Sequence, residues 1–217
     1  MTTLSVAIVD YGLGNLHSVQ LACEHVGLAA RITSDRREVL DADAVILPGV
    51  GAFGDAMGTL NRLDLVGVLR DVAASGKPLF GICLGLQLLM ESSEEFGQHQ
   101  GLGIIKGRVV PLGEPRENGR RLKVPQVGWN GVQKPATVDW SETPLRDIAT
   151  NEMFYFVHSF VVVPEDEGVV CSTTAYGDVD FCSSVRYGNV FACQFHPERS
   201  GERGLTVYHN LVHSLSD

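Results

Sequence analysis

The sequence predicts an α/β fold, a doubly wound, mostly parallel sheet with flanking helices and an added antiparallel set of strands. Over residues 5–91, short apolar runs alternate with helix-like segments, an order typical of a parallel sheet with right-handed crossovers. From residue 104 onward, short strand-like runs dominate instead. The length of 217 residues suits one large domain, and we expect a single domain over residues 1–217.

The first half of the chain reads as four pairs of a strand and a helix. The expected strands cover residues 5–9, 28–32, 44–47 and 79–83. The expected helices cover residues 16–26, 35–40, 55–74 with a break near 61–64, and 84–90. Asn15 is a good N-cap for the first helix and Gly27 a good C′ residue, while Ser34 or Asp35 can cap the second.

The second half of the chain reads mainly as strands. The expected strands lie within residues 106–112, 153–163, 169–175, 181–186 and 190–195. Gly188-Asn189 separates the last two and is a hairpin signal of the II′ type. Residues 97–103, 111–121 and 134–144 are expected loops, and the last element is an expected helix over residues 201–215.

Composition excludes several classes of function. The net charge is −9, from 17 basic and 26 acidic residues, which argues against nucleic acid and against an anionic membrane surface as partners. The sequence lacks the run of about 18 apolar residues that a transmembrane helix needs, and its first ten residues lack the basic region of a signal peptide. Five widely spaced cysteines, an odd number, suit reduced thiols. We therefore expect a cytoplasmic protein.

Cys83 occupies the point where a buried strand pattern changes into a helix pattern. It is flanked by Gly81 and Gly85 in a G-x-C-x-G motif. A residue on such a turn is often held in a strained backbone conformation, and flanking glycines relieve the crowding. The sulfur would project at the carboxyl end of a strand and at a helix N-terminus, where a thiolate is stabilised. Cys83 is therefore a candidate nucleophile; the alternative is a small buried hydrophobe.

A cysteine nucleophile needs a base, and His196 in the segment QFHPE is the most informative histidine. In an extended segment, side chains two residues apart point to the same side. Glu198 could then accept a bond from one ring nitrogen while the other nitrogen faces the thiol. His158 is a rival base, but no carboxylate follows it two residues on. The alternative is a histidine and a glutamate at a strand edge that share no partner.

An acyl-transfer site also needs donors for the oxyanion that forms on the substrate. The backbone N–H of Leu84, the residue after the candidate nucleophile, is one expected donor. The segment PGVG follows a neighbouring strand and can offer a second from Val50 or Gly51, since its glycines permit a peptide flip. The alternative is an ordinary turn between a strand and a helix.

The segments GICLGLQ, QFHPE and PGVG, in their spacing, resemble the class I glutamine amidotransferases. The resemblance implies that L-glutamine is hydrolysed through a γ-glutamyl thioester, without a cofactor or a metal. It also implies that Cys83 is the nucleophile, His196 the general base and acid, and Glu198 the orienting carboxylate. Gln87 matches the family position that contacts the glutamine substrate.

Further segments narrow the resemblance. VDYGLGNLHSV, PGVGAFGDAM, KVPQVGWN and YFVHSF are similar to the family of glutaminase subunits of imidazole glycerol phosphate synthases. This implies a role in L-histidine biosynthesis, with ammonia passed to a cyclase subunit, a (β/α)8 barrel, in a heterodimer. Phe160 stands where the family frequently has tyrosine, and Arg199 where it frequently has lysine.

The resemblance also assigns residues around the site. His158, Ser159 and Gly51 match positions that line the glutamine site. Candidate contacts to the cyclase subunit are Asn15, Lys123, Gln126 and Trp129. An aromatic residue in a loop rich in Gly and Asn is more often at a surface contact than in the core, which supports this interpretation of Trp129.

Several other interpretations are open to test. Glutaminase subunits of anthranilate or aminodeoxychorismate synthases share the cysteine elbow and the HPE, but they do not combine them with the segments above. A binding module that has lost catalysis would not need Cys83, His196 and Glu198 together. A cysteine peptidase or thiol-dependent chaperone would lack KVPQVGWN. His209 and His213 have a metal-like spacing but no third ligand nearby, and Gly12-Leu13-Gly14 lacks the third glycine of a dinucleotide motif.

Overall fold

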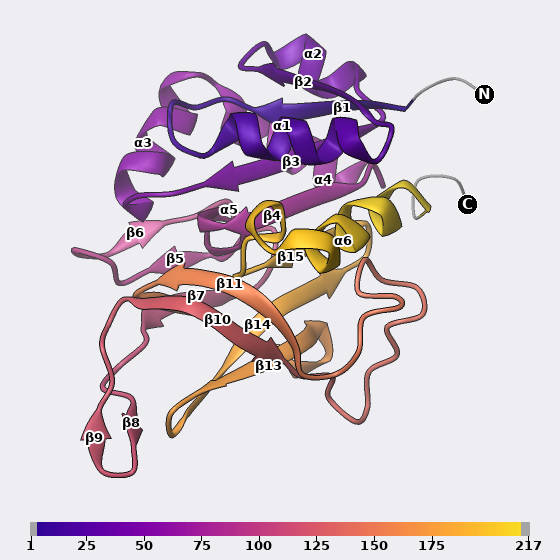
Figure 1. The fold of residues 1–217 in the computed structure, drawn as a ribbon. Helices are drawn as coiled ribbons and strands as arrows, with labels where there is room; N and C mark the ends of the chain where they lie inside the picture. The colour runs from indigo at the N-terminus through magenta and orange to yellow at the C-terminus, as the bar shows by residue number, and fades with distance from the viewer. Residues whose placement is uncertain (1–3, 214–217) are drawn as a thin grey trace.

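A mixed β-sheet runs through the structure, a computed structural model that describes residues 4–213 (Figure 1). Its strands are β1 (Ser5–Val9), β2 (Ala29–Thr33), β3 (Ala44–Gly49), β4 (Leu79–Cys83), β5 (Ser92–Ser93), β6 (His99–Gln100), β7 (Gly107–Pro111), β12 (Phe160–Pro164), β13 (Val170–Tyr176), β14 (Val179–Tyr187) and β15 (Val190–Cys193). They lie in the order β2-β1-β3-β4-β15-β14-β12-β7-β5-β6, with β13 paired to β14. The first five of that order are mutually parallel, and β14 joins them antiparallel through β15. The predicted combination of parallel and antiparallel strands is confirmed.

Helices cover both faces of the parallel part. They are α1 (Leu16–His25), α2 (Arg36–Asp41), α3 (Phe53–Arg62), α4 (Leu65–Ala74), α5 (Leu84–Leu88) and α6 (Gly201–His213), with 3-10 turns η1 (Glu167–Val169) and η2 (Pro197–Arg199). Successive side chains of a strand point to opposite faces of a sheet. Val6 and Ile8 accordingly pack with α1 and α6, whereas Ala7 and Val9 pack with α2 to α5. The doubly wound architecture is confirmed.

A second, two-stranded sheet lies beside the carboxyl ends of the parallel strands. It pairs β10 (Gln126–Val132) antiparallel with β11 (Glu152–His158). Phe154 and Phe156 of β11 pack on Phe195, with ring centroids 4.4 and 5.8 Å apart. These aromatic contacts fix β11 against the segment that follows β15, so the end of β11 lies near the end of β4.

Four expectations need correction, three of them in the second half. Residues 153–163 form two strands, because Ser159 separates β11 and β12, which pair with different neighbours. The expected loops contain β6 and a small hairpin of β8 (Arg116–Glu117) and β9 (Arg120–Arg121). Trp129 lies on β10 and not in a loop. The helix after Cys83 ends at Leu88, because the next carbonyls accept bonds from residues 102–105. The expected helix end at residue 215 lies outside the described residues.

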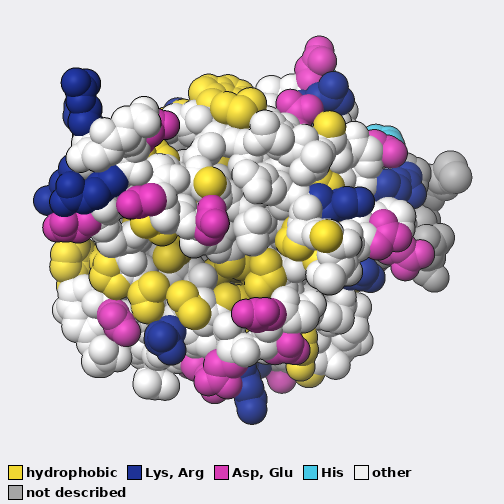
Figure 2. Space-filling view, turned by 90° about the horizontal axis from the view of Figure 1, so that it is seen from below, with side chains coloured by type: hydrophobic (Ala, Val, Ile, Leu, Met, Phe, Trp, Pro, Cys, Tyr) yellow, Lys and Arg dark blue, Asp and Glu magenta, His cyan; other side chains and the backbone are white. Residues whose placement is uncertain are grey.

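The negative net charge is not evenly spread over the surface. Seen from below, Lys and Arg side chains gather at the left edge, on the side where Figure 1 places the β8–β9 hairpin (Figure 2). The exposed arginines of that hairpin are Arg116, Arg120 and Arg121. A band of hydrophobic side chains crosses the middle of the same view. Among the helices of residues 4–213, none is long and apolar enough to cross a membrane.

Candidate active site

Cys83 ends β4 in a strained backbone conformation. Its φ is 54° and its ψ is −106°, a backbone conformation that residues other than glycine rarely adopt. A Cβ on Gly81 would lie 2.9 Å from the Ala192 Cβ, and one on Gly85 would lie 1.8 Å from the Leu47 carbonyl oxygen. Both flanking glycines are therefore needed for the turn to pack against β3 and β15. The strained elbow predicted from the G-x-C-x-G motif is confirmed.

Substituting Gly85 by alanine should lower the free energy of unfolding by about 3 kcal/mol or more, because a backbone carbonyl cannot move aside cheaply. Gly67 on α4 is the matched control, since no heavy atom lies within 4 Å of a Cβ built there. Gly67→Ala should leave stability unchanged or raise it by up to about 1 kcal/mol. Urea unfolding of both variants measures the difference. Equal stability of Gly85→Ala and wild type would contradict the crowding.

His196 and Glu198 form a buried pair directly after β15. The His196 Nδ1 lies 2.8 Å from the Glu198 Oε1, and the two side chains are almost fully buried. The contact itself was expected, but the expected cause, an extended segment from His196 to Glu198, is wrong. The strand ends at Cys193, and Glu198 lies in the 3-10 turn η2, so a tight turn brings the carboxylate to the ring. The Ser200 hydroxyl donates to the His196 carbonyl oxygen at 2.7 Å and holds the start of this turn.

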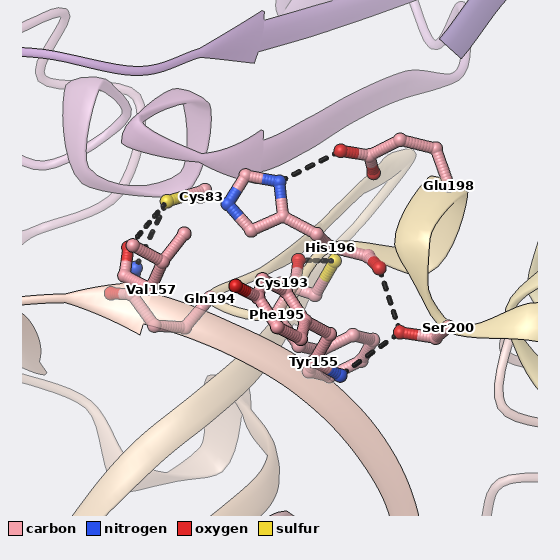
Figure 3. Close-up of polar contacts among 9 residues, drawn as sticks. All are labelled: Cys83, Tyr155, Val157, Cys193, Gln194, Phe195, His196, Glu198 and Ser200. Carbon is pink, nitrogen blue, oxygen red and sulfur yellow. Dashed lines mark hydrogen bonds and ion pairs between the residues drawn. The ribbon is translucent and has the colours of Figure 1, made fainter. Parts of the chain in front are cut away.

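The other nitrogen of His196 faces the sulfur of Cys83. Figure 3 shows the ring between Cys83 and Glu198, with Nδ1 on the carboxylate side and Nε2 on the sulfur side. Nε2 is buried and makes no hydrogen bond within the described part of the chain. Burial alone lowers the pKa of His196, but the Cys83 sulfur and the Glu198 carboxylate outweigh it and raise the pKa to about 10. A ring whose protonated form is stabilised in this way is suited to accept a proton from the thiol.

His158 is not placed to act as the base. Its Nδ1 lies 3.0 Å from the Phe160 carbonyl oxygen, and its Nε2 lies 3.0 Å from the Gln126 Oε1. Burial lowers its pKa to about 4, so the ring is neutral and has one N–H. The Phe160 carbonyl oxygen and the Gln126 Oε1 both accept, so this single N–H can donate to only one of them at a time. Both ring nitrogens therefore lie against oxygens of the protein.

Gln126 was expected at the partner surface, and this expectation is wrong. Its side chain is only 2% exposed and bonds to His158. The alternation of side chains along β10 explains the difference, because Gln126 points inward while Val127 and Trp129 are exposed, the latter by 53%. Asn15 and Lys123 are also exposed, as a partner contact requires. Asn15 precedes α1, but its side chain does not cap the helix.

The segment after β3 lies beside Cys83, as an oxyanion site would require. Gly49 pairs with Cys83 in the parallel ladder, so Val50 and Gly51 follow at the level of the sulfur. The Tyr11 hydroxyl donates to the Pro48 carbonyl oxygen at 2.7 Å and fixes the end of β3. Leu84 is the first residue of α5, where backbone N–H groups have no partner within the helix. Which N–H groups hold an oxyanion stays a prediction.

A cavity of about 420 Å³ opens above Cys83. Besides Cys83, its lining contains six residues assigned from the sequence: Val50, Gly51, Leu84, Gln87, His158 and Ser159. It also contains Glu95 and Arg199, which no motif singled out as site residues. Glu95 lies in a polar stretch after the elbow, and only the fold brings it to the cavity, where its Oε2 accepts from the Phe53 N–H at 2.6 Å.

Arg199 connects the cavity to the exposed face of β10 and β11. Its guanidinium lies 4.2 Å from the centre of the Tyr155 ring. The Tyr155 ring in turn meets Trp129 edge to face, with centroids 6.2 Å apart. The same Tyr155 accepts from the His196 N–H through its carbonyl oxygen at 2.9 Å. Tyr155 therefore contacts both the exposed Trp129, through its ring, and the candidate base His196, through its backbone.

Comparison with known proteins gives a consistent set of relatives. The family model of glutamine amidotransferase class-I matches residues 7–214. A protein of Syntrophotalea carbinolica named imidazole glycerol phosphate synthase subunit HisH is 49% identical over 209 residues, covering 95% of this chain and 98% of that protein. A protein of Aquifex aeolicus with the same name is 47% identical over 213 residues, covering 96% of each.

Solved structures agree with these relatives at the level of the fold. The structure of PurLQS from Thermotoga maritima matches with a TM-score of 0.74 at 22% identity, covering 99% of this chain and 100% of that one. A crystal structure of a glutamine amidotransferase matches with a TM-score of 0.72 at 19% identity, covering 98% and 99%. At these identities the structural matches establish the architecture alone.

Proposed function

Since this chain belongs to the class I glutamine amidotransferases, and within them to the HisH subunits of imidazole glycerol phosphate synthase, we propose that Cys83, His196 and Glu198 hydrolyse L-glutamine to glutamate and ammonia. The chain is a glutaminase of histidine biosynthesis. One observation carries the assignment of the residues. The buried His196 ring lies between the Glu198 carboxylate and the sulfur of Cys83, and Cys83 lines a cavity at the carboxyl ends of the strands.

The first half of the reaction forms a thioester. The Cys83 proton moves to Nε2 of His196, and Glu198 stabilises the resulting imidazolium through Nδ1. The thiolate attacks the side-chain carbonyl carbon of glutamine, so that a C–S bond forms and the carbonyl electron pair moves to oxygen. His196 returns the proton to the amide nitrogen, the C–N bond breaks, and ammonia leaves.

The second half releases glutamate. His196 takes a proton from water, which attacks the thioester carbonyl carbon. The C–S bond breaks, its electron pair returns to sulfur, and His196 gives its proton back to the sulfur. The product departs as glutamate after its new carboxyl group loses a proton to water. In both halves an oxyanion forms, and the proposed donors are the N–H groups of Leu84 and of Val50 or Gly51, each worth about 10²- to 10³-fold in rate.

The cavity offers complementary groups for the rest of the substrate. Glutamine carries an α-ammonium and an α-carboxylate at the end away from its amide. The Glu95 carboxylate suits the ammonium, and Ser159 and the Gly51 backbone supply uncharged hydrogen-bonding groups. The Gln87 NH2 donates to the Phe160 carbonyl oxygen at 3.1 Å, so the amide oxygen is the part of this side chain suited to the substrate.

The relatives are named as subunits of a synthase, and a cyclase subunit is the implied partner. We infer further that the partner is a (β/α)8 barrel, that the complex is a heterodimer and that ammonia passes between the subunits out of contact with solvent. The exposed Trp129, Lys123 and Asn15 are the proposed contacts. The five cysteines are all free thiols, which supports a reducing compartment such as the cytoplasm.

Co-purification with tagged cyclase subunit tests the partner. Trp129→Ala should weaken the complex by about tenfold or more, because an exposed tryptophan at an interface is often an energetic hot spot. Tyr187→Ala is the matched control, since Tyr187 is a similarly exposed aromatic, 52%, at the opposite ends of the strands. Isothermal titration measures both affinities. Capture by a chorismate-aminating synthase in place of the cyclase would instead support the anthranilate or aminodeoxychorismate alternative.

A further inference from the structure

The Gln194 side chain is fully buried and touches the candidate nucleophile. Its Nε2 lies 3.6 Å from the Cys83 sulfur, and Figure 3 draws this contact as a dashed line. Its Oε1 accepts from the Gln87 Nε2 at 3.1 Å. Each end of this amide thus meets a residue of the proposed site, although Gln194 itself has no part in the triad.

The direction of these hydrogen bonds is fixed by a backbone group. The Phe160 carbonyl oxygen can only accept, so Gln87 must turn its NH2 toward it. The same NH2 faces Gln194, which must then present its oxygen to Gln87. The NH2 of Gln194 is left to point at the sulfur. The opposite orientation would place two NH2 groups against each other and an oxygen against the sulfur.

The geometry points to Gln194 as a further catalytic residue that donates an N–H to the negatively charged sulfur of Cys83. This inference rests on the proposed role of Cys83 as the nucleophile. Hydrogen bonds to a charged partner are about twice as strong as those between neutral groups, so the contact favours the thiolate over the thiol. The Val157 carbonyl oxygen, 3.8 Å from the sulfur, has the opposite preference because it accepts from the protonated thiol.

The contact acts at a particular point of the reaction. When the thiolate attacks glutamine, charge leaves the sulfur and the hydrogen bond weakens. When water has attacked the thioester, the C–S bond breaks and the electron pair returns to sulfur, where the Gln194 N–H receives it. Loss of this donor should therefore slow release of the thioester more than its formation.

Alkylation of Cys83 measures the effect without glutamine. The Cys83 peptide of the full chain is followed by mass spectrometry after iodoacetamide treatment at a series of pH values. Gln194→Leu should move the midpoint of the pH profile upward by about one unit. Asn210→Leu is the control, because Asn210 is also a buried amide but bonds to Pro144 and Arg146. The other groups around the sulfur, His196, Tyr11 and Cys193, are unchanged in both variants.

A second variant keeps the test decisive if Gln194→Leu does not fold. Gln194→Glu preserves the volume and the oxygen that accepts from Gln87, but it places an oxygen where the N–H faced the sulfur. Its alkylation midpoint should rise by more than that of Gln194→Leu. A folded Gln194→Leu or Gln194→Glu with the wild-type midpoint would overturn the inference. Because the alkylation readout needs no turnover, such a result would leave the proposed glutaminase reaction standing. That reaction is tested separately, by measuring glutamine hydrolysis.

Discussion

Replacing Cys83 by alanine should lower the rate of glutamine hydrolysis by about 10⁴-fold or more, because the loss of a triad nucleophile removes the covalent pathway. The fold should survive. Alanine at φ 54° carries no more backbone strain than cysteine at the same angle, and only one sulfur atom is lost. Glutamate release, measured with saturating cyclase subunit, gives the rate, and near-ultraviolet circular dichroism reports the fold. A folded variant that hydrolyses glutamine at the wild-type rate would exclude the proposed mechanism.

Cys23→Ala is the matched control for this experiment. Cys23 is fully buried on α1 and lies outside the cavity, and burial raises its thiol pKa to about 12, so it is neutral at ordinary pH. Its removal should change stability slightly and glutamine hydrolysis hardly at all. A comparable loss in both variants would show that damage to packing, and not loss of a nucleophile, explains the effect.

The parallel half of the fold was predictable because its local and tertiary signals agree. Buried parallel strands need continuous apolar runs, and β1, β3 and β4 each have one. Gly27 follows α1 with φ 86°, as a C′ residue does, and the Asp35 side chain caps α2. The break near residue 64 is also present, where Asp64 has φ 56° between α3 and α4.

The second half was less predictable because its strands depend on distant partners. Strand β10 contains two glycines and a buried Gln126, so no alternation of apolar residues marks it. Its position is set by pairing with β11, a register that local sequence does not encode. The interpretation of Gln126 as a surface residue failed for that reason. Trp129 lies three residues further along the same strand and is on the exposed face, as expected.

The site also contains residues that local sequence predicts and residues that depend on distant partners. Cys83 and His196 could be paired from the sequence because each sits in a segment with its own chemical signature. Gln194 lies two residues before His196 and carries no such signature. Its amide matters only because the Phe160 carbonyl, from another strand, orients Gln87 against it. Hydrogen-bond direction of this kind is a property of the assembled fold.

Activation by the partner is the second large effect that we expect. The isolated chain should hydrolyse glutamine slowly, and the rate should rise by about 10²- to 10³-fold with the cyclase subunit and its nucleotide substrate, the amount that one oxyanion donor contributes. Val50 is 41% exposed at the rim of the cavity, and Gly51 has φ 101°. Within the described part of the chain, neither backbone N–H is held by an acceptor. This peptide segment can therefore change orientation when a partner covers it.

Two substitutions at Val50 separate this explanation from a general effect of binding. Val50→Pro removes the backbone N–H, whereas Val50→Ala keeps it and removes only the exposed side chain. If the Val50 N–H is the donor that the partner brings into place, Val50→Pro should bind the cyclase subunit but lose most of the activation, and Val50→Ala should retain it. Glutamate release with and without partner measures the ratio, and sedimentation confirms the complex. Full activation of Val50→Pro would assign the donor to the Gly51 N–H. If the isolated wild-type chain were as fast as the complex, the donor would already be in place, and partner control of the oxyanion site would be excluded.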